Sequence, residues 1–571
     1  MVTENTKGQK QGGKNLRLQA IIQVLLLSGI LILGNVISSF VFTRFDLTSD
    51  KRFTISETSK KLVANLKDVV YIKVYLEGDF SPGFSKLKQG TREFLDEIRQ
   101  YSNGNIEFEF IDPSANPDEK ERNNLYAQLY QKGIQPTTLE ERTNEGVKRT
   151  YIFPGAIISY ANVEMSVQLL KSQLGVQPEQ MLNNSIQNLE FEFCNAISKA
   201  TNPMQPSIAF IEGHGELDTA EVADLANALK ASYTLKRVTI NGQLGVLKDY
   251  QAVVIAKPDS AFNEKDKFII DQYVMHGGKV IWLLDPMVAS MDSLKQRGEM
   301  MALARDLKLD DMLFRYGVRI NYDLVQDLLS SLIPVVTGMV GNQPKQQFLP
   351  WYYFPVMTPV SKHPIVNNLN SIKGEFVSSI DPINAPGVKS TVLLTTSRYS
   401  RILPAPVRVS LGIMQYKPDP KQFPQHDVPV AVLLEGDFTS LYKNRIPPAI
   451  ADDKTIGFKE SSMNGKMVVI SDGDIIRNDL QRGQPIALGY DKYTNTTYGN
   501  KSFMLNIVDY LCDDAGLMSV RNKEFRLRLI DPSVLDADTK PLQLLNVGIP
   551  LIMIIVFGIV KFYLRKRRFA K

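Results

Sequence analysis

The stretch IAFIEGHGELDTAEVADLANAL, which runs from Ile208 to Leu229, decides the fold of this sequence. It begins with consecutive apolar residues typical of a buried strand, continues through a turn with two glycines, and ends in residues with the apolar spacing of a helix. His214 lies between the two glycines, and an acidic residue flanks them on either side. In many α/β proteins, turns of this kind hold catalytic or phosphate-binding groups. This turn either performs such chemistry or only reverses the chain.

The alternation of strand and helix continues after this stretch. Further strands are predicted in TLKRVTI, YQAVVIAKP and KVIWLLDP, with helices over residues 220–231 and 264–275. Strands that alternate with helices of this length predict a doubly wound, mainly parallel sheet of the flavodoxin or amidotransferase type. We expect DVPVAVLLEGDF, KMVVISDGDIIRND and the helix KSFMLNIVDYLCDD to complete the sheet. The predicted α/β domain therefore covers residues 205–530, with an insertion at about residues 320–405.

The predicted insertion contains a run of aromatic residues. Its sequence FLPWYYFPVM, from Phe348 to Met357, has four adjacent aromatic side chains at residues 351–354. Large apolar groups gathered in this way are typical of a packed lid or an interface. We therefore do not interpret the run as a cofactor site.

The residues before this domain predict a second α/β unit. Strands are expected in VVYIKVYLEGDF and NIEFEFIDP, helices over residues 87–101 and 119–131, and a β-hairpin in RTYIFPGAIISYANVEMSVQLL. The resulting order βαβαββ is that of a thioredoxin-like unit, although the redox cysteines of such proteins are missing. A helix over residues 179–199 and the linker TNPMQP end this unit, which we place at residues 44–204.

Two uncharged apolar runs lie near the ends of the chain, at Gln19–Phe42 and Leu542–Val560. About 20 such residues in a helix span the hydrocarbon layer of a membrane. We predict transmembrane helices over residues 19–43 and 542–564, the second preceded by a linker at residues 531–541. A cleaved signal peptide is the alternative for the first run. That run is longer than the usual apolar region of a signal peptide, and no A-x-A-like cleavage site follows it.

The charges beside these runs predict the topology. Four basic residues and one acid precede the first run, and six basic residues without an acid follow the second. By the positive-inside rule, the tails at residues 1–18 and 565–571 face the cytoplasm, so the predicted location is the bacterial inner membrane with the body in the periplasm. The residues before the first run carry +3 and those after the second run, Lys561 included, carry +6, so subtracting +9 from the net charge of +5 leaves about −4 on the body. Such a body does not favour nucleic acid, whereas the tails are expected to contact membrane lipid.

The cysteine and histidine pattern predicts no metal and no cofactor. Cys194 and Cys512 are the two cysteines, and neither belongs to a CxxC motif or to a Cys/His ligand spacing. Two buried thiols and one long-range disulfide both remain open as interpretations.

Turn-forming and acidic residues follow four of the predicted strands. Because the carboxyl ends of parallel strands share one edge of the sheet, these residues are expected to converge there. The candidate ligand- or partner-binding edge consists of Glu212, Gly213, His214, Gly215, Glu216, Asp259, Asp285, Asp472 and Asp474.

The sequence lacks the groups that would make this edge catalytic. GHGE offers no nucleophile, and no G-x-S-x-G serine or cysteine occupies a strand-to-helix turn. Neither G-x-G-x-x-G after a strand nor G-x-x-x-x-G-K-[ST] is present, so the chain is not itself an ATPase. We predict no catalytic residues and no enzymatic activity. An architectural turn is favoured, and a noncatalytic ligand or partner site is the alternative.

Several motifs in this order resemble one family. RFDLTSDKRFTIS after the first apolar run, IEGHGE, HGGKVIWLLDP, HPIVNNLNSI, VVISDGDIIRNDL and YGNKSFMLNIVDYL resemble the gliding-motility-associated ABC transporter accessory proteins of the GldG type. The resemblance covers nearly the whole chain. The central domain is also similar to one found in an intraflagellar transport protein, where it serves assembly.

The resemblance implies a noncatalytic accessory subunit in Bacteroidota, acting in gliding motility and associated export. Its implied partners are a separate ABC ATPase chain, a separate ABC permease chain, and a periplasmic load or substrate. The alternative is a membrane-anchored periplasmic hydrolase or carbohydrate-binding protein that uses the acidic strand-exit edge, since a carboxylate pair can act as acid and base.

Overall fold

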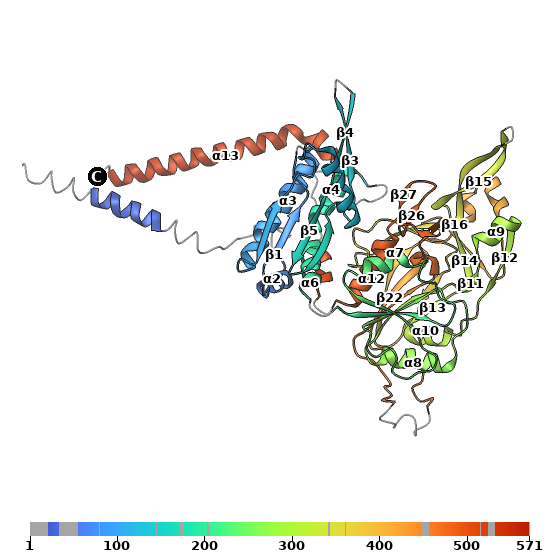
Figure 1. The fold of residues 1–571 in the computed structure, drawn as a ribbon. Helices are drawn as coiled ribbons and strands as arrows, with labels where there is room; N and C mark the ends of the chain where they lie inside the picture. The colour runs from blue at the N-terminus through green and yellow to red at the C-terminus, as the bar shows by residue number, and fades with distance from the viewer. Residues whose placement is uncertain are drawn as a thin grey trace, which may run out of the picture. The chain divides into compact units, whose positions relative to one another are not determined.

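The computed structural model describes residues 21–33, 55–78, 80–143, 146–171, 176–202, 205–340, 343–359, 361–446, 456–513, 516–522 and 532–569. The chain divides into two units (Figure 1). One is the body, Ile55–Lys523, and the other combines the terminal segments Met1–Thr54 and Glu524–Lys571. Within the body we call residues 55–202 the N-terminal region and residues 205–513 the large-sheet region.

The N-terminal region is built on a four-stranded sheet of order β2-β1-β5-β6. β1 and β2 are parallel, whereas β5 is antiparallel to both β1 and β6. The strands are β1 (Val70–Val74), β2 (Ile106–Phe110), β5 (Gly155–Tyr160) and β6 (Val163–Gln168). A separate hairpin, β3 (Thr137–Thr143) with β4 (Gly146–Ile152), lies between α4 and β5 in the chain.

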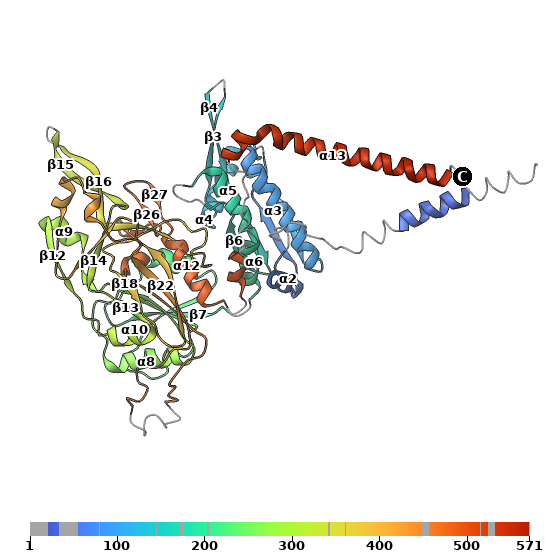
Figure 2. The ribbon, with the colours of Figure 1, turned by 180° about the vertical axis from the view of Figure 1, so that it is seen from behind.

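Helices cover both faces of this sheet. On one face, α2, α3 and α6 bury a core with the apolar side chains of all four strands, and α3 contacts α6 (Figure 2). On the other face, Leu129 of α4 packs with Ile157 and neighbouring apolar residues. The helices are α2 (Glu57–Ala64), α3 (Pro82–Tyr101), α4 (Glu119–Gln131), α5 (Pro178–Gln187) and α6 (Leu189–Thr201). The region is thus a three-layer α/β/α arrangement.

The large-sheet region is built on a ten-stranded sheet. Its main path runs β15-β16-β19-β22-β23-β10-β9-β7-β8, with β17 paired to β16. The five strands from β8 to β23 are parallel, and β22, β19, β16 and β15 continue the sheet with antiparallel pairs. The parallel strands are β7 (Ser207–Glu212), β8 (Thr234–Thr239), β9 (Ala252–Ala256), β10 (Lys279–Leu283) and β23 (Gly465–Ile470). The antiparallel strands are β15 (Ser330–Val340), β16 (Gln343–Pro359), β17 (Ile372–Lys373), β19 (Val388–Thr395) and β22 (Pro429–Gly436).

Alternate side chains of the parallel strands enter two cores, one on each face. Ile208 and Phe210 pack with α7 and α12, and Ala209 and Ile211 pack with α8 and α10. Figure 1 shows α7 and α12 above the strands and α8 and α10 below them. The helices are α7 (Ala223–Leu229), α8 (Glu264–Met275), α10 (Asp310–Tyr316) and α12 (Asn500–Leu511). Burial on both faces explains why these strands have nearly continuous apolar sequences.

The predicted insertion forms additional short ladders and a third core. Trp351, Tyr353 and Phe354 of β16 are buried with Leu294 and Phe376, whereas Phe348 is exposed. The aromatic run is therefore packed against the protein itself. Of the other short elements in this part of the protein, some lie inside the predicted insertion and others flank it. They are β11 (Met287–Val288), α9 (Met291–Arg297), β12 (Glu299–Ala304), β13 (Val318–Ile320), β14 (Asp323–Asp327), β18 (Ile380–Pro382), β20 (Ser400–Pro404) and β21 (Val407–Ser410).

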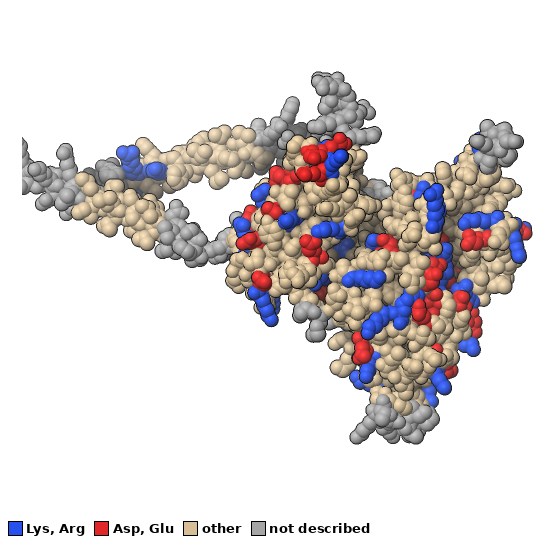
Figure 3. Space-filling view, in the orientation of Figure 1, with Lys and Arg blue, Asp and Glu red and all other residues tan. Residues whose placement is uncertain are grey.

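The terminal segments contain two apolar helices among the described residues. α13 (Pro532–Phe569) includes the 22-residue stretch Asn546–Arg567, which is long and apolar enough to cross a membrane. The other helix, Ile21–Leu33, is shorter, and the rest of the first predicted span lies outside the described residues. Figure 3 shows uncharged surface along α13 that is followed by basic side chains near its end. These features are consistent with membrane anchoring.

Four details differ from the sequence prediction. The predicted linker at residues 531–541 is helical from Pro532, where α13 begins. The segment RTYI belongs to β4 and pairs with β3, which the sequence prediction missed. The single helix predicted over residues 179–199 is interrupted at Asn188, because α5 packs on α3 whereas α6 packs mainly on β5 and β6. Finally, the large sheet is parallel only in one half.

Cys194 and Cys512 are not joined by a disulfide.

Candidate functional site

The loops after β7 and β9 lie where the strand order reverses, which is the usual ligand crevice of an open α/β sheet. In this protein the two loops bind each other. The amides of Asp259 and Ser260 donate to the carbonyl oxygen of His214 at 2.9 and 3.0 Å, and the Leu217 amide donates to Ala256 at 3.0 Å. Main-chain groups that would face a ligand are therefore used to join the loops.

Gly215 makes this junction possible. Its φ of +76° is a left-handed conformation that favours glycine, and a Cβ at this position would lie 1.8 Å from Oδ1 of Asp259. With glycine at residue 215, the loops after β7 and β9 approach each other more closely than any other residue at this position would allow.

His214 is buried between two carboxylates. Its Nε2 lies 3.1 Å from Oδ2 of Asp266, its Nδ1 lies 3.3 Å from Oε1 of Glu216, and its ring stacks on Phe262 with centroids 3.9 Å apart. Burial favours the neutral ring, but the carboxylates of Glu216 and Asp266 outweigh burial and raise the pKa of His214. A charged ring carries the proton on Nε2 for the hydrogen bond to Asp266 and forms an ion pair with Glu216, so this arrangement favours the charged ring.

A second cluster gathers the acids that follow β10 and β23. One oxygen from each of Asp285, Asp472 and Asp474 lies within 4.8 Å of the others. The Lys257 ammonium, from the end of β9, lies 3.2 Å from Oδ2 of Asp285 and forms a closer ion pair with Asp474. Arg477 adds a second cation at 2.8 Å from Asp474.

The charges of this cluster depend on one another. Burial and the carboxylates of Asp474 and Asp285 raise the pKa of Asp472 well above its ordinary range. Burial also raises the pKa of Asp285, although the Lys257 ammonium opposes this effect. Burial disfavours the charged form of Lys257, but Asp285 and Asp474 outweigh it and raise the pKa of Lys257. Lys257 is therefore the positive charge that makes a buried group of three acids tolerable.

Three carboxylates at this separation offer oxygen ligands of the kind that a divalent cation prefers. The ammonium of Lys257 already lies against two of them. Other oxygens of the three acids accept main-chain hydrogen bonds. Oδ1 of Asp285 accepts from the Gly473 amide at 2.5 Å, and Oδ1 of Asp472 accepts from the Asp474 amide at 2.8 Å. This donor set fits an internal ion-pair network better than a metal site.

The insertion also covers this edge. The Glu375 amide donates to Oδ2 of Asp472 at 2.8 Å, and the Ser378 amide donates to the carbonyl oxygen of Ser471 at 3.1 Å. A Cβ on Gly374 would lie 3.0 Å from Asp472 Oδ2. A segment of the protein's own chain therefore lies against the carboxyl end of β23, at the position where ligands approach such sheets.

The structure divides the predicted site residues between these two clusters. Gly213, His214, Gly215, Glu216 and Asp259 lie in the joined loops, and Asp285, Asp472 and Asp474 lie in the acidic cluster. Glu212 belongs to neither, because it pairs with Arg237 of β8.

Sequence reasoning missed Lys257, Asp266 and Glu375. Asp266 lies in the first turn of a helix that was predicted correctly. Lys257 follows a predicted strand directly, and a lysine at the end of a buried strand close to several acids was an available signal.

Comparison with known proteins identifies the family to which this chain belongs. The fold defines an α/β body in a chain that also carries a C-terminal apolar helix of membrane-spanning length. A family model described as "ABC-type uncharacterized transport system" matches residues 205–507, more than half of the chain, and a model described as "Domain of unknown function" matches residues 49–159. The chain belongs to this family of auxiliary proteins of ABC transport systems. The predicted class, an ABC transporter accessory protein, is thereby confirmed.

Similarity to individual proteins is low. No curated protein matches the sequence. Among solved structures, "mmIFT52 N-terminal domain" is 12% identical over 54% of this chain and 97% of its own, with a TM-score of 0.31. "Exo-beta-1,4-mannosidase Op5Man5 from Opitutaceae bacterium strain TAV5" is 9% identical over 82% of this chain and 55% of its own, with a TM-score of 0.18. Neither TM-score is high enough to define the fold.

Replacing Lys257 by methionine should destabilise the large-sheet region strongly. The change leaves a buried group of carboxylates without its ammonium, and loss of one partner of a buried ion pair costs about 3–5 kcal/mol. Urea unfolding of the detergent-solubilised full chain, followed by tryptophan fluorescence, measures this loss, because both tryptophans lie in this region. Lys265→Met, on the exposed side of α8, is the control and should change stability little. Equal unfolding midpoints for the two variants would contradict the role given to Lys257.

Gly215→Ala should destabilise the protein more than Gly298→Ala. Both glycines have φ near +75°, so both substitutions introduce similar backbone strain. A Cβ at residue 298 has open space around it, whereas a Cβ at residue 215 would collide with Asp259. We expect a loss of about 1 kcal/mol for Gly298→Ala and a larger loss for Gly215→Ala. Similar losses in thermal unfolding would show that the close approach of the loops does not matter.

The stabilising effect of His214 should depend on pH. The pKa of His214 is higher in the folded protein than in the unfolded chain, so its stabilisation is complete below the ordinary pKa and is lost as pH rises through the folded value. The difference in unfolding free energy between wild type and His214→Gln should be largest near pH 6 and should narrow as pH rises toward 9. A constant or widening difference would show that the ring is not charged in the folded state.

Proposed function

We propose that this protein is a noncatalytic accessory subunit of an ABC transport system that serves gliding motility and associated export in Bacteroidota. The observation that carries the noncatalytic part is that the strand-exit edge is filled by the protein itself. Loops bound to each other occupy the crevice beside β7, and the segment with Gly374 and Glu375 lies against β23. A substrate would have to displace ordered main chain to reach the acids.

The membrane part of the proposal is supported by α13. Its side chains from Asn546 to Arg567 are exposed apart from the half-buried Gly548, as expected for a helix that faces lipid. Basic residues and no acids follow its apolar part, which supports a cytoplasmic carboxyl end and a periplasmic body in the inner membrane. Because the sequence contains no phosphate-binding loop, the ATPase and the permease are separate chains in this proposal.

We further infer that the body contains two domains, with a boundary close to residues 204–205. The strand order β2-β1-β5-β6, with α3 and α6 on one face and α4 on the other, supports a thioredoxin-like class for the first. The parallel order β8-β7-β9-β10-β23 supports a flavodoxin-like class for the second, extended by antiparallel strands. In this proposal both domains position partners.

Co-purification from membranes of the native host tests the assignment. The tagged full chain, solubilised in mild detergent, should retain an ABC ATPase and an ABC permease that mass spectrometry identifies. A variant in which residues 546–560 are replaced by an unrelated apolar helix of equal length should fold normally but lose both partners, and motility should fail. Recovery of the full chain without either transporter protein would contradict the proposal. Release of a glycan or peptide product by the purified protein would instead favour the hydrolase alternative.

A further inference from the structure

Both ends of the body belong to the same hydrophobic core. Ile55, at its beginning, and Leu517, near its end, are buried together with Val63, Phe193 and Ile197 of the N-terminal region. Leu517 begins the short 3-10 helix η4 (Leu517–Asn522), which follows α12 of the large-sheet region. The chain thus returns from the large-sheet region to the N-terminal region before it continues toward α13. Both chain connections to the terminal segments therefore leave from the N-terminal region.

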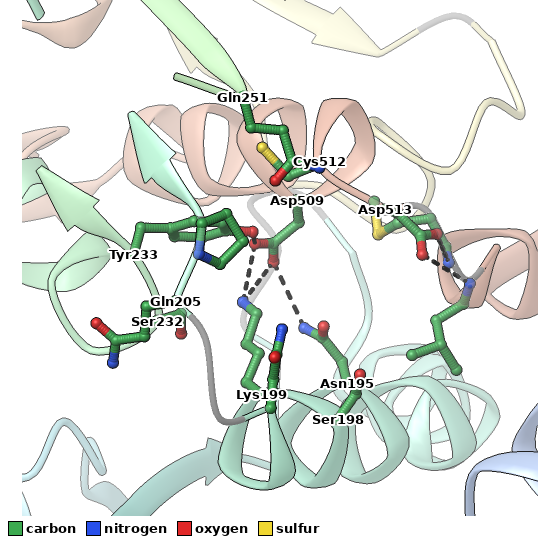
Figure 4. Close-up of a pocket in the computed structure, with 14 residues that line it drawn as sticks. Asn195, Ser198, Lys199, Gln205, Ser232, Tyr233, Gln251, Asp509, Cys512 and Asp513 are labelled. Carbon is green, nitrogen blue, oxygen red and sulfur yellow. Dashed lines mark hydrogen bonds and ion pairs between the residues drawn. The ribbon is translucent and has the colours of Figure 1, made fainter. Parts of the chain in front are cut away.

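The two regions meet at the carboxylate of Asp509, on α12. Nζ of Lys199 lies 2.8 Å from both of its oxygens, the Tyr233 hydroxyl donates to Oδ1 at 2.8 Å, and Nδ2 of Asn195 lies 3.4 Å from Oδ2. Figure 4 shows Lys199 and Asn195 rising from α6 toward this carboxylate while Tyr233 approaches from the side. One acid of the large-sheet region is thus held by two side chains of the N-terminal region.

This contact is sheltered from solvent. The side chain of Asp509 is 10% exposed and that of Lys199 is 22% exposed. A largely buried ion pair with additional hydrogen bonds is costly to break from one side, because the remaining charge stays buried without its partner. An exposed ion pair of the same length would contribute little.

A polar cavity of about 200 Å³ lies beside the contact. Its lining is mostly amide, hydroxyl and carboxylate side chains, including Ser198, Gln205, Ser232 and Asp513. Polar side chains therefore provide most of the lining on this side of the junction, beside the buried Leu517 and Met518. The polar contact through Asp509 holds the two regions together there.

η4 attaches to both regions on the other side of the junction. The guanidinium of Arg521 is buried over the ring of Phe191 in α6, 5.5 Å from the ring centroid. Its carbonyl oxygen accepts a hydrogen bond from Nδ2 of Asn367, in the large-sheet region, at 2.8 Å. Asp513 accepts hydrogen bonds from the amides of Leu517 and Met518 at 3.1 and 2.7 Å, which fixes the start of η4.

We propose that α6, α12 and η4 form a mechanical joint that makes the N-terminal and large-sheet regions behave as one body, with Asp509 as the residue that locks it. A displacement of the N-terminal region reaches the large-sheet region through this joint. When the contacts of the joint are intact, the large-sheet region moves together with the N-terminal region. When they are lost, the two regions move and unfold separately. This role adds a conformational device to the proposed function and does not depend on the identity of any partner.

Calorimetry of the detergent-solubilised full chain tests the joint. The wild-type body should unfold in one cooperative transition, and Asp509→Ala should unfold in two, because the coupling between the regions is lost. Asp224→Ala is the matched control. Asp224 also pairs with a lysine of α12, Lys501, at 3.0 Å and accepts a main-chain amide at 2.8 Å, but all of these groups lie within the large-sheet region. This variant should lower the temperature of a single transition without splitting it.

Two further variants keep the test decisive. Lys199→Met removes the partner from the opposite region and should produce the same split as Asp509→Ala. Asp509→Asn, which retains the shape of the side chain, should split the transition even if the alanine variant fails to fold. A single transition in Lys199→Met and Asp509→Asn would overturn the proposal, as would two transitions in the wild-type body.

Discussion

The buried ammonium of Lys257 is the interaction on which the carboxyl edge of the large sheet depends. Three strand ends meet there, and two of them bring aspartates into a place that solvent hardly reaches. Carboxylates that are this close and this buried repel one another and favour their neutral forms. The ammonium from the end of β9, assisted by Arg477 at Asp474, lets the turns after β9, β10 and β23 pack together. The same cation occupies the place in which a ligand or a metal would otherwise balance the charge.

This arrangement explains why the edge resembles an active site in sequence but not in structure. Acids, glycines and a histidine at strand ends are the residues that catalytic α/β proteins use. In this protein the histidine neutralises two acids, a glycine permits two loops to bind each other, and an amide of the insertion satisfies Asp472. The polar groups of the edge are engaged mainly with one another. Membership in a family of transport auxiliary proteins is compatible with a body that serves as a structural partner.

Much of the fold could be predicted from apolar runs and helix signals. α4 and α8 have the predicted boundaries because their amino-terminal ends are marked by Asp118 and Asn263, whose side chains cap the helices. Strand β3 could not be predicted, because TTLEERT is polar and pairs only with β4. The antiparallel half of the sheet was also hidden, since a buried strand has the same sequence pattern in either direction. At the site, the aspartates were predicted but their partners were not. The sequence places Lys257 at the end of a strand, but its φ of +55°, which sets the direction of its side chain, has no sequence signal.

The central position of β23 in the sheet has a consequence for the order in which the strands pair during folding. β10 ends at Leu283, yet its neighbour on the open side, β23, begins only at Gly465. Until β23 has reached the same compartment and paired, this hydrogen-bonding edge of β10 has no native partner, and an unpaired apolar edge invites pairing with other chains. Closing so long a loop is also a slow step in folding. The long stretch between β10 and β23 therefore leaves one strand edge exposed during folding, and this edge is protected only when the last parallel strand pairs.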